Sequence, residues 1–288
     1  MLNLTKTGKP RDISQDMILD STSLTRSSTE STNKYLKKLT HVHLQNKRIK
    51  NIEGLKICPN LKVIYLYDNQ IENIETVNEL LYLEYIQLQG NMIRVIPDIK
   101  LIKLQKLFLN HNEISFISGL EACQNLEELH VSTQSLPDNQ PLQFDPMSLN
   151  AISISLLVLD CSGNNINILE PFKVLINLQR LDMSRNNITD LNEIIDLFTL
   201  PLHLTEANFM DNPCTKIYNY RNYIISSSFP CLEMLDEKPV TPENHTNITG
   251  FMTHKDKLHA VNKRDITKGD ICQSDNSMLN DFTLQGNY

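Results

Sequence analysis

The sequence predicts an α/β fold: a right-handed solenoid, bent into a horseshoe, with one parallel sheet on its concave side and short 3-10 or helical turns on its convex side. One observation behind this prediction is the pattern LKVIYLYDNQIENI over residues 61–74, which recurs through most of the chain. Another is its spacing of about 22 residues, which has room for a strand and a tight turn but not for a full crossover helix.

Eight copies of the pattern are present, more than the roughly three that a stacked array needs to bury a continuous core. They begin at Leu39, Leu61, Leu83, Leu104, Leu126, Leu156, Leu178 and Leu204, and the intervals are nearly equal except for longer ones before Leu156 and Leu204. The shared form, L-x-x-I-x-L-x-x-N-x-I-x-x-I in the second copy, is that of a leucine-rich repeat. We therefore predict a leucine-rich-repeat solenoid over residues 35–236.

Within each copy, two apolar residues that lie two apart on the strand, such as Ile64 and Leu66, point to one face, which becomes the core. The asparagine three residues later is predicted to turn inward, where its amide can satisfy backbone groups of adjacent coils. These residues are Asn69, Asn91, Asn112, Asn164, Asn186 and Asn212. We interpret them as a structural ladder rather than as ligands.

Two copies break the ladder. Lys47 occupies the asparagine position in the first copy, where a terminal repeat has only one neighbour, and Gln134 occupies it in the fifth. Gln134 falls in the longest interval and precedes a proline-rich segment, so we predict a loop insertion over about residues 135–153 that bulges from the array. This loop is either part of a binding face or a tolerated surface insertion.

The ends of the solenoid are predicted to differ from its repeats. Residues 1–34 form a polar N-terminal arm, in which three apolar residues either make a helical turn over the open end or belong to a disordered arm. These are Ile13, Met17 and Ile18. Residues 213–236 are expected to form a closing cap with a short helix, and residues 237–288 a disordered tail.

Composition and charge narrow the function. The net charge of −7 disfavours a nucleic-acid partner, because such binding depends on clustered Lys and Arg. Residues 1–10 lack the apolar core of a secretory signal, and no apolar run of about 18 residues could span a membrane, so we expect a cytoplasmic chain without a membrane partner. The six scattered cysteines are then predicted to be reduced thiols, several of them in the core.

No catalytic or metal-binding pattern is recognisable. The eight histidines and six cysteines show no C-x2-C or H-x3-H pairing, and there is no G-x-S-x-G or phosphate-binding glycine loop. His41 and His43 would share one face of the first strand, and we interpret them as a solvated pair rather than as a metal site. The sequence predicts a protein that is not an enzyme and uses no cofactor or metal.

The candidate binding surface is the concave face of the sheet, to which the residues between the core positions point. It carries an aromatic patch over repeats two to four and acidic side chains further on, to which Glu128 and Asp211 contribute. Clustered exposed aromatic residues are typical of interface cores, although the tyrosines could merely pack on one another, and an acidic field favours a basic partner. The predicted protein-binding residues are His43, Tyr65, Tyr67, Tyr85, Gln87, Phe108, His130, Asp160, Asp182 and Glu206.

The repeats and the C-terminal cap together resemble the protein-phosphatase-1 regulatory class of leucine-rich-repeat proteins, over about residues 35–236. The cap has the form Asn-Pro…Tyr-Arg…Pro-x-Leu-x-x-Leu-Asp. Its residues here are Asn212, Pro213, Tyr220, Arg221, Pro230, Leu232, Leu235 and Asp236. The resemblance implies a regulator that binds the protein phosphatase 1 catalytic subunit and lies at the cytoskeleton and centrosome, with tubulin or other cytoskeletal proteins as further partners.

The chain departs from that class in lacking a docking motif of the form K/R-x-V/I-x-F. The nearest match, Ile114-Ser115-Phe116, has no preceding basic residue, so the phosphatase would have to contact the concave face. Two other functions stay open. One is a microtubule, centrosome or ciliary adaptor without an effect on the phosphatase. The other is an RNA-splicing scaffold of similar build, which the acidic charge disfavours.

Overall fold

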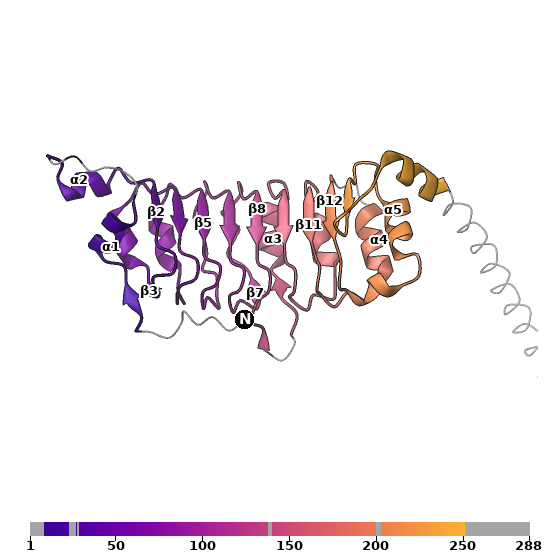
Figure 1. Ribbon diagram of the computed structural model, residues 1–288, viewed down its shortest axis with the longest axis horizontal. Helices are drawn as coiled ribbons and strands as arrows, with labels where there is room; N and C mark the ends of the chain where they lie inside the picture. Colours follow the sequence, from indigo (N-terminus) through magenta and orange to yellow (C-terminus); the bar gives the residue numbers. More distant parts are fainter. Residues whose placement is uncertain (1–8, 23–26, 28, 138–139, 200–202, 251–288) are drawn as a thin grey trace, which may run out of the picture.

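The computed structural model describes residues 9–22, 27, 29–137, 140–199 and 203–250, and it is a leucine-rich-repeat solenoid, as the repeat pattern predicts (Figure 1). Within these residues the main sheet has ten strands in the order β14-β13-β12-β11-β10-β8-β6-β5-β4-β2. Nine of them form the parallel part of the sheet: β2 (His41–His43), β4 (Val63–Tyr65), β5 (Tyr85–Gln87), β6 (Lys106–Phe108), β8 (Glu128–His130), β10 (Val158–Asp160), β11 (Arg180–Asp182), β12 (Glu206–Asn208) and β13 (Met234–Leu235).

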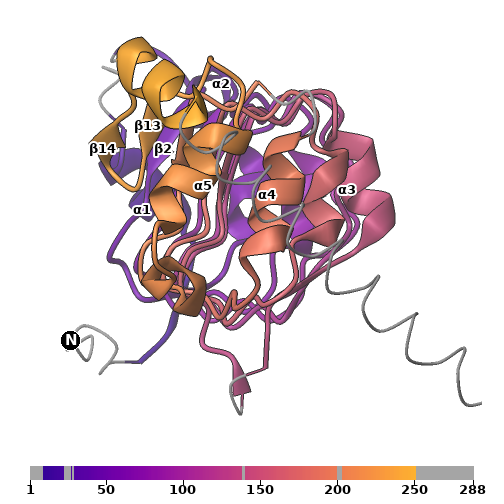
Figure 2. The same cartoon turned by 90° about the vertical axis from the view of Figure 1, so that its right-hand side faces the viewer.

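Short helices build the side of the coil opposite the sheet (Figure 2). The shorter repeats use 3-10 turns, as in η2 (Glu53–Ile57), η3 (Glu75–Glu79) and η5 (Glu170–Val174). The two longer intervals hold α-helices instead, α3 (Pro146–Ile152) and α4 (Leu191–Thr199). An α-helix rises about 1.5 Å per residue against about 2.0 Å in a 3-10 helix, so the extra residues fit into a coil of similar length. No helix in the described residues is long and apolar enough to cross a membrane.

The core lies between the sheet and these turns, and it repeats from coil to coil. The strands pair in register, so that Ile64 is opposite Ile86 and Ile86 is opposite Leu107. All three side chains are buried. Each repeat therefore covers the apolar face of the next, which is why the predicted core positions are the observed ones.

The predicted asparagine ladder joins neighbouring coils. Oδ1 of Asn69 accepts hydrogen bonds from the backbone N–H groups of Lys47 and Ile49, at 2.9 and 3.0 Å. Its Nδ2 donates to the carbonyls of Leu44 and Leu66, at 2.9 and 2.8 Å. Because Asn69 is buried, each bond removes the cost of an unsatisfied backbone group.

Gln134 does not break the ladder, so the prediction was wrong at this position. Its Oε1 accepts a hydrogen bond from the N–H of Ile114 at 3.1 Å, and its Nε2 donates to the carbonyls of Leu109 and Val131 at 2.9 and 3.0 Å. Glutamine carries the same amide as asparagine and can satisfy the same groups. The first repeat does lack an amide there, because Lys47 occupies the position and its side chain is exposed.

The insertion is not simply a bulging loop. Its strand β9 (Gln143–Phe144) pairs in parallel with β7 (Phe116–Ile117), and α3 follows with Asp145 as its N-cap. Leu149 and Ile152 of α3 are buried in the core. The predicted loop over residues 135–153 was therefore wrong in its second half, because apolar residues at helical spacing pack against the array.

The described part of the N-terminal arm covers the first repeat. β1 (Arg11–Asp12) pairs with β3 (Ile49–Asn51), and α1 (Gln15–Asp20) buries Ile18 completely. α2 (Thr32–Leu36) adds Tyr35 and Leu36 to the same core. Of the two alternatives from the sequence, the structure has the helical turn over the open end, because the first coil has no preceding neighbour to bury its apolar face.

The C-terminal cap extends further than predicted. It contains η6 (Pro213–Lys216) and α5 (Tyr220–Ser227), followed by β14 (Lys238–Pro239), which pairs antiparallel with β13. Val240 is buried and residues 242–250 are helical. The predicted start of a disordered tail at residue 237 was therefore wrong, since the chain after Asp236 folds back onto the last strand. Residues 1–8 and 251–288 lie outside the described residues.

Among the described residues, four cysteines are buried: Cys58, Cys123, Cys161 and Cys214. Burial raises the pKa of the thiols of Cys58 and Cys214 to about 11 and of Cys123 to about 12, because apolar surroundings disfavour the thiolate. We expect iodoacetamide at pH 8 to leave all four unmodified in the folded protein and to alkylate them in urea, as measured by peptide mass spectrometry. The exposed Cys231 is the internal control. Alkylation of Cys123 as fast as Cys231 without urea would contradict this expectation.

Candidate functional site

Register pairing arranges the concave face in two rows. One row is His43, Tyr65, Gln87, Phe108, His130, Asp160, Asp182 and Asn208, and the other is His41, Val63, Tyr85, Lys106, Glu128, Val158, Arg180 and Glu206. Nine of the ten predicted residues lie in these rows, and the tenth, Tyr67, follows β4 on the same face. Strands are about 4.8 Å apart, so neighbours within a row can touch.

Five side chains, four from the first register row and Tyr85 from the second, form a continuous line of ring contacts. We call this line the aromatic row: His43, Tyr65, Tyr85, Phe108 and His130. His43 stacks on Tyr65 with ring centroids 4.5 Å apart, and Phe108 stacks on His130 at 4.3 Å. Tyr85 links the two stacks through edge contacts of 5.9 Å to Tyr65 and 5.3 Å to Phe108. His43 is exposed and the other four are half-buried, so the rings pack on one another and still present surface to solvent.

Gln87 and Tyr67 adjoin the aromatic row. Nε2 of Gln87 donates a hydrogen bond of 2.6 Å to the hydroxyl of Tyr85, which fixes that ring, and burial raises the pKa of Tyr85 above its ordinary value. Tyr67 is half-buried two residues beyond Tyr65. Both were predicted, and both border the row without extending its line of ring contacts.

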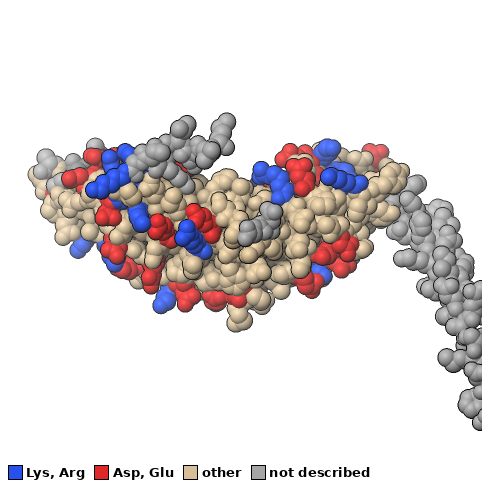
Figure 3. All heavy atoms as spheres, turned by 90° about the horizontal axis from the view of Figure 1, so that it is seen from below, with Lys and Arg blue, Asp and Glu red and all other residues tan. Residues whose placement is uncertain are grey.

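Lysine–glutamate pairs flank the aromatic row. Nζ of Lys106 lies 2.6 Å from Oε1 of Glu128, and Nζ of Lys62 lies 2.8 Å from Oε1 of Glu84. The hydrogen bond to Glu128 raises the pKa of Lys106 above its ordinary value. Glu128 lies on the concave face as predicted, and Lys106 balances its charge there. On the side of the molecule that Figure 3 shows from below, basic and acidic residues likewise lie side by side.

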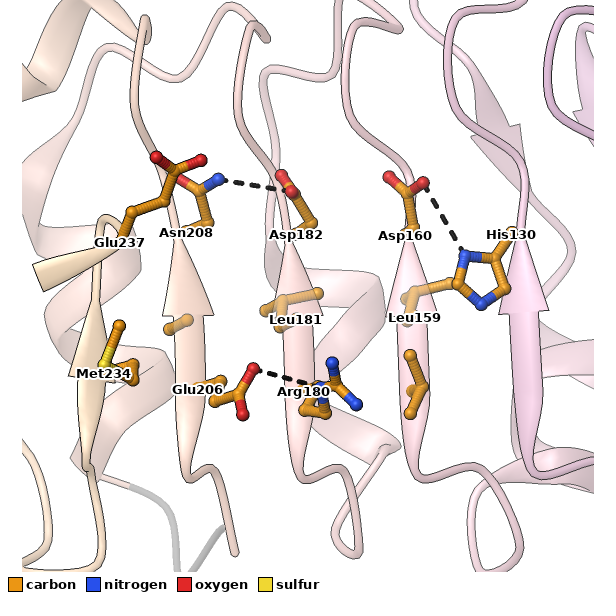
Figure 4. Close-up of a pocket in the computed structure, with 12 residues that line it drawn as sticks. His130, Leu159, Asp160, Arg180, Leu181, Asp182, Glu206, Asn208, Met234 and Glu237 are labelled. Atoms are coloured by element: carbon orange, nitrogen blue, oxygen red, sulfur yellow. Dashed lines mark hydrogen bonds and ion pairs between the residues drawn. The ribbon is translucent and has the colours of Figure 1, made fainter.

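A concavity of about 370 Å³ continues the face beyond the aromatic row, and we call it the acidic hollow (Figure 4). Its lining includes the carboxylates of Asp160, Asp182, Glu206 and Glu237. Arg180 is the basic residue of the lining, and its Nε lies 3.0 Å from Oε2 of Glu206. The structure thus brings Asp160, Asp182 and Glu206 together and adds Glu237, whereas Asp211 is exposed and is not part of the lining.

Asp160 and Asp182 each bind the backbone two residues on. Oδ1 of Asp160 accepts a hydrogen bond from the N–H of Ser162 at 3.1 Å, and Oδ1 of Asp182 accepts one from Ser184 at 2.8 Å. On the next strand Asn208 makes the same bond, to the N–H of Met210 at 3.1 Å. A neutral amide oxygen thus makes this bond in place of a carboxylate, so the bond does not depend on a negative charge.

Asp160 joins the acidic hollow to the aromatic row. Its Oδ2 lies 3.7 Å from Nδ1 of His130 and accepts a hydrogen bond from Asn110 at 3.4 Å. Burial acts to raise the pKa of Asp160, but the contact with His130 and the hydrogen bonds from Ser162 outweigh it, so the pKa lies below its ordinary value. Asp160 is therefore ionised at neutral pH.

Met234 and Glu237 line the hollow from the C-terminal end and were not predicted from the sequence. They lie on β13 and just after it, in and beyond the predicted cap. One signal could have found them: Leu232 and Leu235 repeat the L-x-x-L spacing of the strands, which indicates a further parallel strand.

His41 and His43 lie on the same exposed face of β2, and His43 stacks on Tyr65. Among the residues that the structure describes, no group of three or more His, Cys, Asp or Glu side chains is placed to hold a metal ion.

Comparison with known proteins agrees with this geometry. The family model for two copies of leucine-rich repeats matches residues 37–80, and a model for a single leucine-rich repeat matches residues 177–199. Both models describe leucine-rich repeats, in agreement with the solenoid fold.

Two relatives match part of the chain. Cilia- and flagella-associated protein 410 of Mus musculus is 34% identical over 113 residues, which cover 38% of this chain and 43% of that protein. Centrosomal protein of 72 kDa of Mus musculus is 29% identical over 137 residues, which cover 47% of this chain and 21% of that protein. The chain thus spans less than half the length of either relative.

Among solved structures, internalin C2 of Listeria monocytogenes aligns with 65% of this chain and 90% of its own, at 23% identity and a TM-score of 0.45.

Proposed function

We propose that this chain is a non-catalytic scaffold of ciliary, centrosomal or other microtubule-associated assemblies and that it holds a partner protein on its concave face. The observation that carries the proposal is the aromatic row, a line of five packed and partly exposed rings on the face that repeat proteins use for binding. The names of the two relatives, one ciliary and one centrosomal, support the choice of assembly.

The chemistry of the aromatic row suits the core of an interface. Aromatic side chains bring large apolar area with few rotatable bonds, and they dominate binding hot spots. The mutual stacking of the rings orders them before binding, so less side-chain entropy is lost when a partner docks. The flanking pairs Lys62–Glu84 and Lys106–Glu128 provide the polar rim that surrounds such cores.

The triple variant Tyr65→Ala/Tyr85→Ala/Phe108→Ala is expected to lose localisation. In cultured ciliated cells, the tagged wild-type chain should concentrate at centrosomes or ciliary bases. The triple variant should lose that enrichment about tenfold or more, because each hot-spot ring contributes roughly 1–2 kcal/mol of binding free energy. The measurement is the ratio of fluorescence at a centrosomal marker to that in the surrounding cytoplasm, with co-sedimentation of the purified chain on microtubules as a second readout.

Tyr82→Ala is the matched control. Tyr82 is 45% exposed in the turn before β5, with the Lys103 ammonium above its ring, and it lies outside both rows of the concave face. Its loss should leave localisation unchanged. If the wild-type chain is diffuse in cells and does not sediment with microtubules, the proposed role in a microtubule-associated assembly is wrong. If the triple variant is folded and keeps full enrichment, the aromatic row is not the surface that binds the partner.

Regulation of protein phosphatase 1 is a second candidate function, favoured by the form of the cap. Residues 66–69, 128–131 and the insertion at 136–137 and 144–146 look like those of protein phosphatase 1 regulatory subunit 42, the testis leucine-rich-repeat protein. Ile114 is buried, so residues 114–116 cannot serve as an extended docking motif. The phosphatase would instead have to bind the concave face, an argument by analogy with related regulators.

Purified phosphatase 1 catalytic subunit tests this second candidate. If the chain is a regulator, it binds the subunit in a pull-down, the triple variant loses that binding, and the rate of phosphopeptide hydrolysis changes on binding. Co-sedimentation with microtubules without any binding to the catalytic subunit would leave the adaptor function alone.

A further inference from the structure

We propose that the partner segment on the concave face is a helix with two chemically different halves, apolar side chains over the aromatic row and arginine or lysine side chains in the acidic hollow. This inference rests on the proposed function, because it names the chemistry and the orientation of the segment that the face holds. Three features of the face support it: its charge, its satisfied backbone and the spacing between its two halves.

The hollow carries a net negative charge. Four carboxylates, from Asp160, Asp182, Glu206 and Glu237, face one guanidinium, from Arg180. Asn208 makes the same backbone hydrogen bond as the two aspartates, so that bond forms without a negative charge at this position. A concave, partly desolvated surface strengthens the attraction of such a charge for a cation. The complementary partner is therefore basic at this end.

The aromatic row requires a different chemistry at the other end. Four of its five rings are half-buried, and the charges of Lys106 and Glu128 beside them pair at 2.6 Å. Apolar side chains of a partner would complete the burial of the rings, at about 25 cal/mol per Å² of apolar surface removed from water. A uniformly basic segment would leave this half of the face uncovered.

A helix suits this face better than an extended peptide. The face is the side-chain surface of a sheet whose backbone groups already pair between neighbouring strands. An extended segment laid on it would find no backbone partners for its own N–H and C=O groups, whereas a helix satisfies them internally. Helices that bind grooves in this way present anchors at i, i+3, i+4 and i+7.

The distance between the aromatic row and the acidic hollow sets the spacing of the apolar and basic anchor residues on the partner helix. Phe108 on β6 and Asp160 on β10 are two strand intervals apart, because β8 lies between them. At about 4.8 Å per interval this is roughly 10 Å, which a helix rising about 1.5 Å per residue crosses in about seven residues, or two turns. The apolar and basic anchors should therefore lie near i and i+7 on one side of the partner helix.

Designed helical peptides test the inference on the full chain by fluorescence anisotropy. Each is alanine-based and exceeds the length of about 15 residues below which isolated helices are marginal in water. The first carries leucine and phenylalanine in its first half and arginine two turns later. A second has glutamate in place of arginine, and a third has alanine in place of the apolar anchors. We expect only the first to bind well, with an affinity that falls as salt rises, because the charges are partly exposed.

The variant Asp160→Asn/Asp182→Asn should weaken binding of the arginine peptide about tenfold or more, while keeping both backbone hydrogen bonds as Asn208 does. The matched control is Glu53→Gln/Glu75→Gln, which removes two charges from η2 and η3 and should change the affinity less than twofold. Equal binding of the arginine and glutamate peptides, unchanged binding by a folded aspartate variant, or no binding of the arginine peptide would overturn the inference.

Localisation separates this inference from the proposed function. A chain with Asp160→Asn/Asp182→Asn that keeps full centrosomal enrichment, while the aromatic triple variant loses it, would overturn the basic partner and leave the scaffold function standing. Loss of enrichment in both variants, with the Glu53→Gln/Glu75→Gln control unaffected, would support both. A wild-type chain without enrichment would count against the function itself, whatever the peptides do.

Discussion

Asn186→Ala is expected to lower the free energy of unfolding by about 3–5 kcal/mol, at the upper end for a single substitution. Oδ1 of Asn186 accepts hydrogen bonds from the N–H groups of Asn164 and Ile166, at 2.9 and 3.0 Å. Its Nδ2 donates to the carbonyls of Cys161 and Met183, at 3.1 and 3.0 Å. Alanine leaves these buried groups without a side-chain partner, and each unsatisfied group costs about 1–3 kcal/mol. Urea denaturation followed by circular dichroism measures the change.

Asn187→Ala is the control for this prediction, since Asn187 is adjacent in sequence but exposed. It should change stability by less than about 0.5 kcal/mol. Asn186→Gln adds a second check, because Gln134 serves the same ladder with the longer side chain. The glutamine variant should recover part of the loss. A cost below about 1 kcal/mol for Asn186→Ala would contradict the structural role of the ladder.

Phe209→Ala is expected to cost about 3–5 kcal/mol, because it leaves a cavity in the core of the last full repeat. Phe209 is fully buried, and its ring meets Phe198 of α4 edge-on, with centroids 6.2 Å apart. The substitution removes this ring contact between α4 and the residue after β12. The backbone N–H of Phe209 keeps its hydrogen bond to Asp236 in either case, so the effect is one of packing.

The loss of stability in Phe209→Ala should be local as well as large. In a solenoid each repeat contacts only its neighbours, so stability is close to a sum of repeat and interface contributions. Hydrogen exchange of Phe209→Ala should therefore rise first in β12, β13 and α5, while β4, β5 and β6 stay protected. Phe229→Ala is the control, since Phe229 lies in the same cap but is 44% exposed. An equal loss of protection in every repeat would contradict this expectation.

Part of the candidate site could be predicted from the sequence, because the repeats keep a constant register. A regular repeat places each position of the pattern in the same environment, so Tyr65, Tyr85 and Phe108 could be assigned to one face before any coordinates. That they touch in a line with His43 and His130 depends on side-chain orientations across five strands, which periodicity does not specify. Gln134 is similar: its residue type suggested a broken ladder, and only its contacts identify it as a member.

The solenoid, its repeat positions, its core and the residues of its concave face follow from the repeat pattern, because those properties recur in every coil and each copy reinforces the others. Tertiary structure alone decided where the cap ends, how the insertion folds and which charges remain unbalanced. These depend on contacts that occur once: β14 folding back on β13, Leu149 of α3 entering the core, and Lys106 pairing with Glu128 while Asp160 faces the hollow. A periodic pattern specifies what recurs, whereas a single contact between distant residues is specified only by the folded chain.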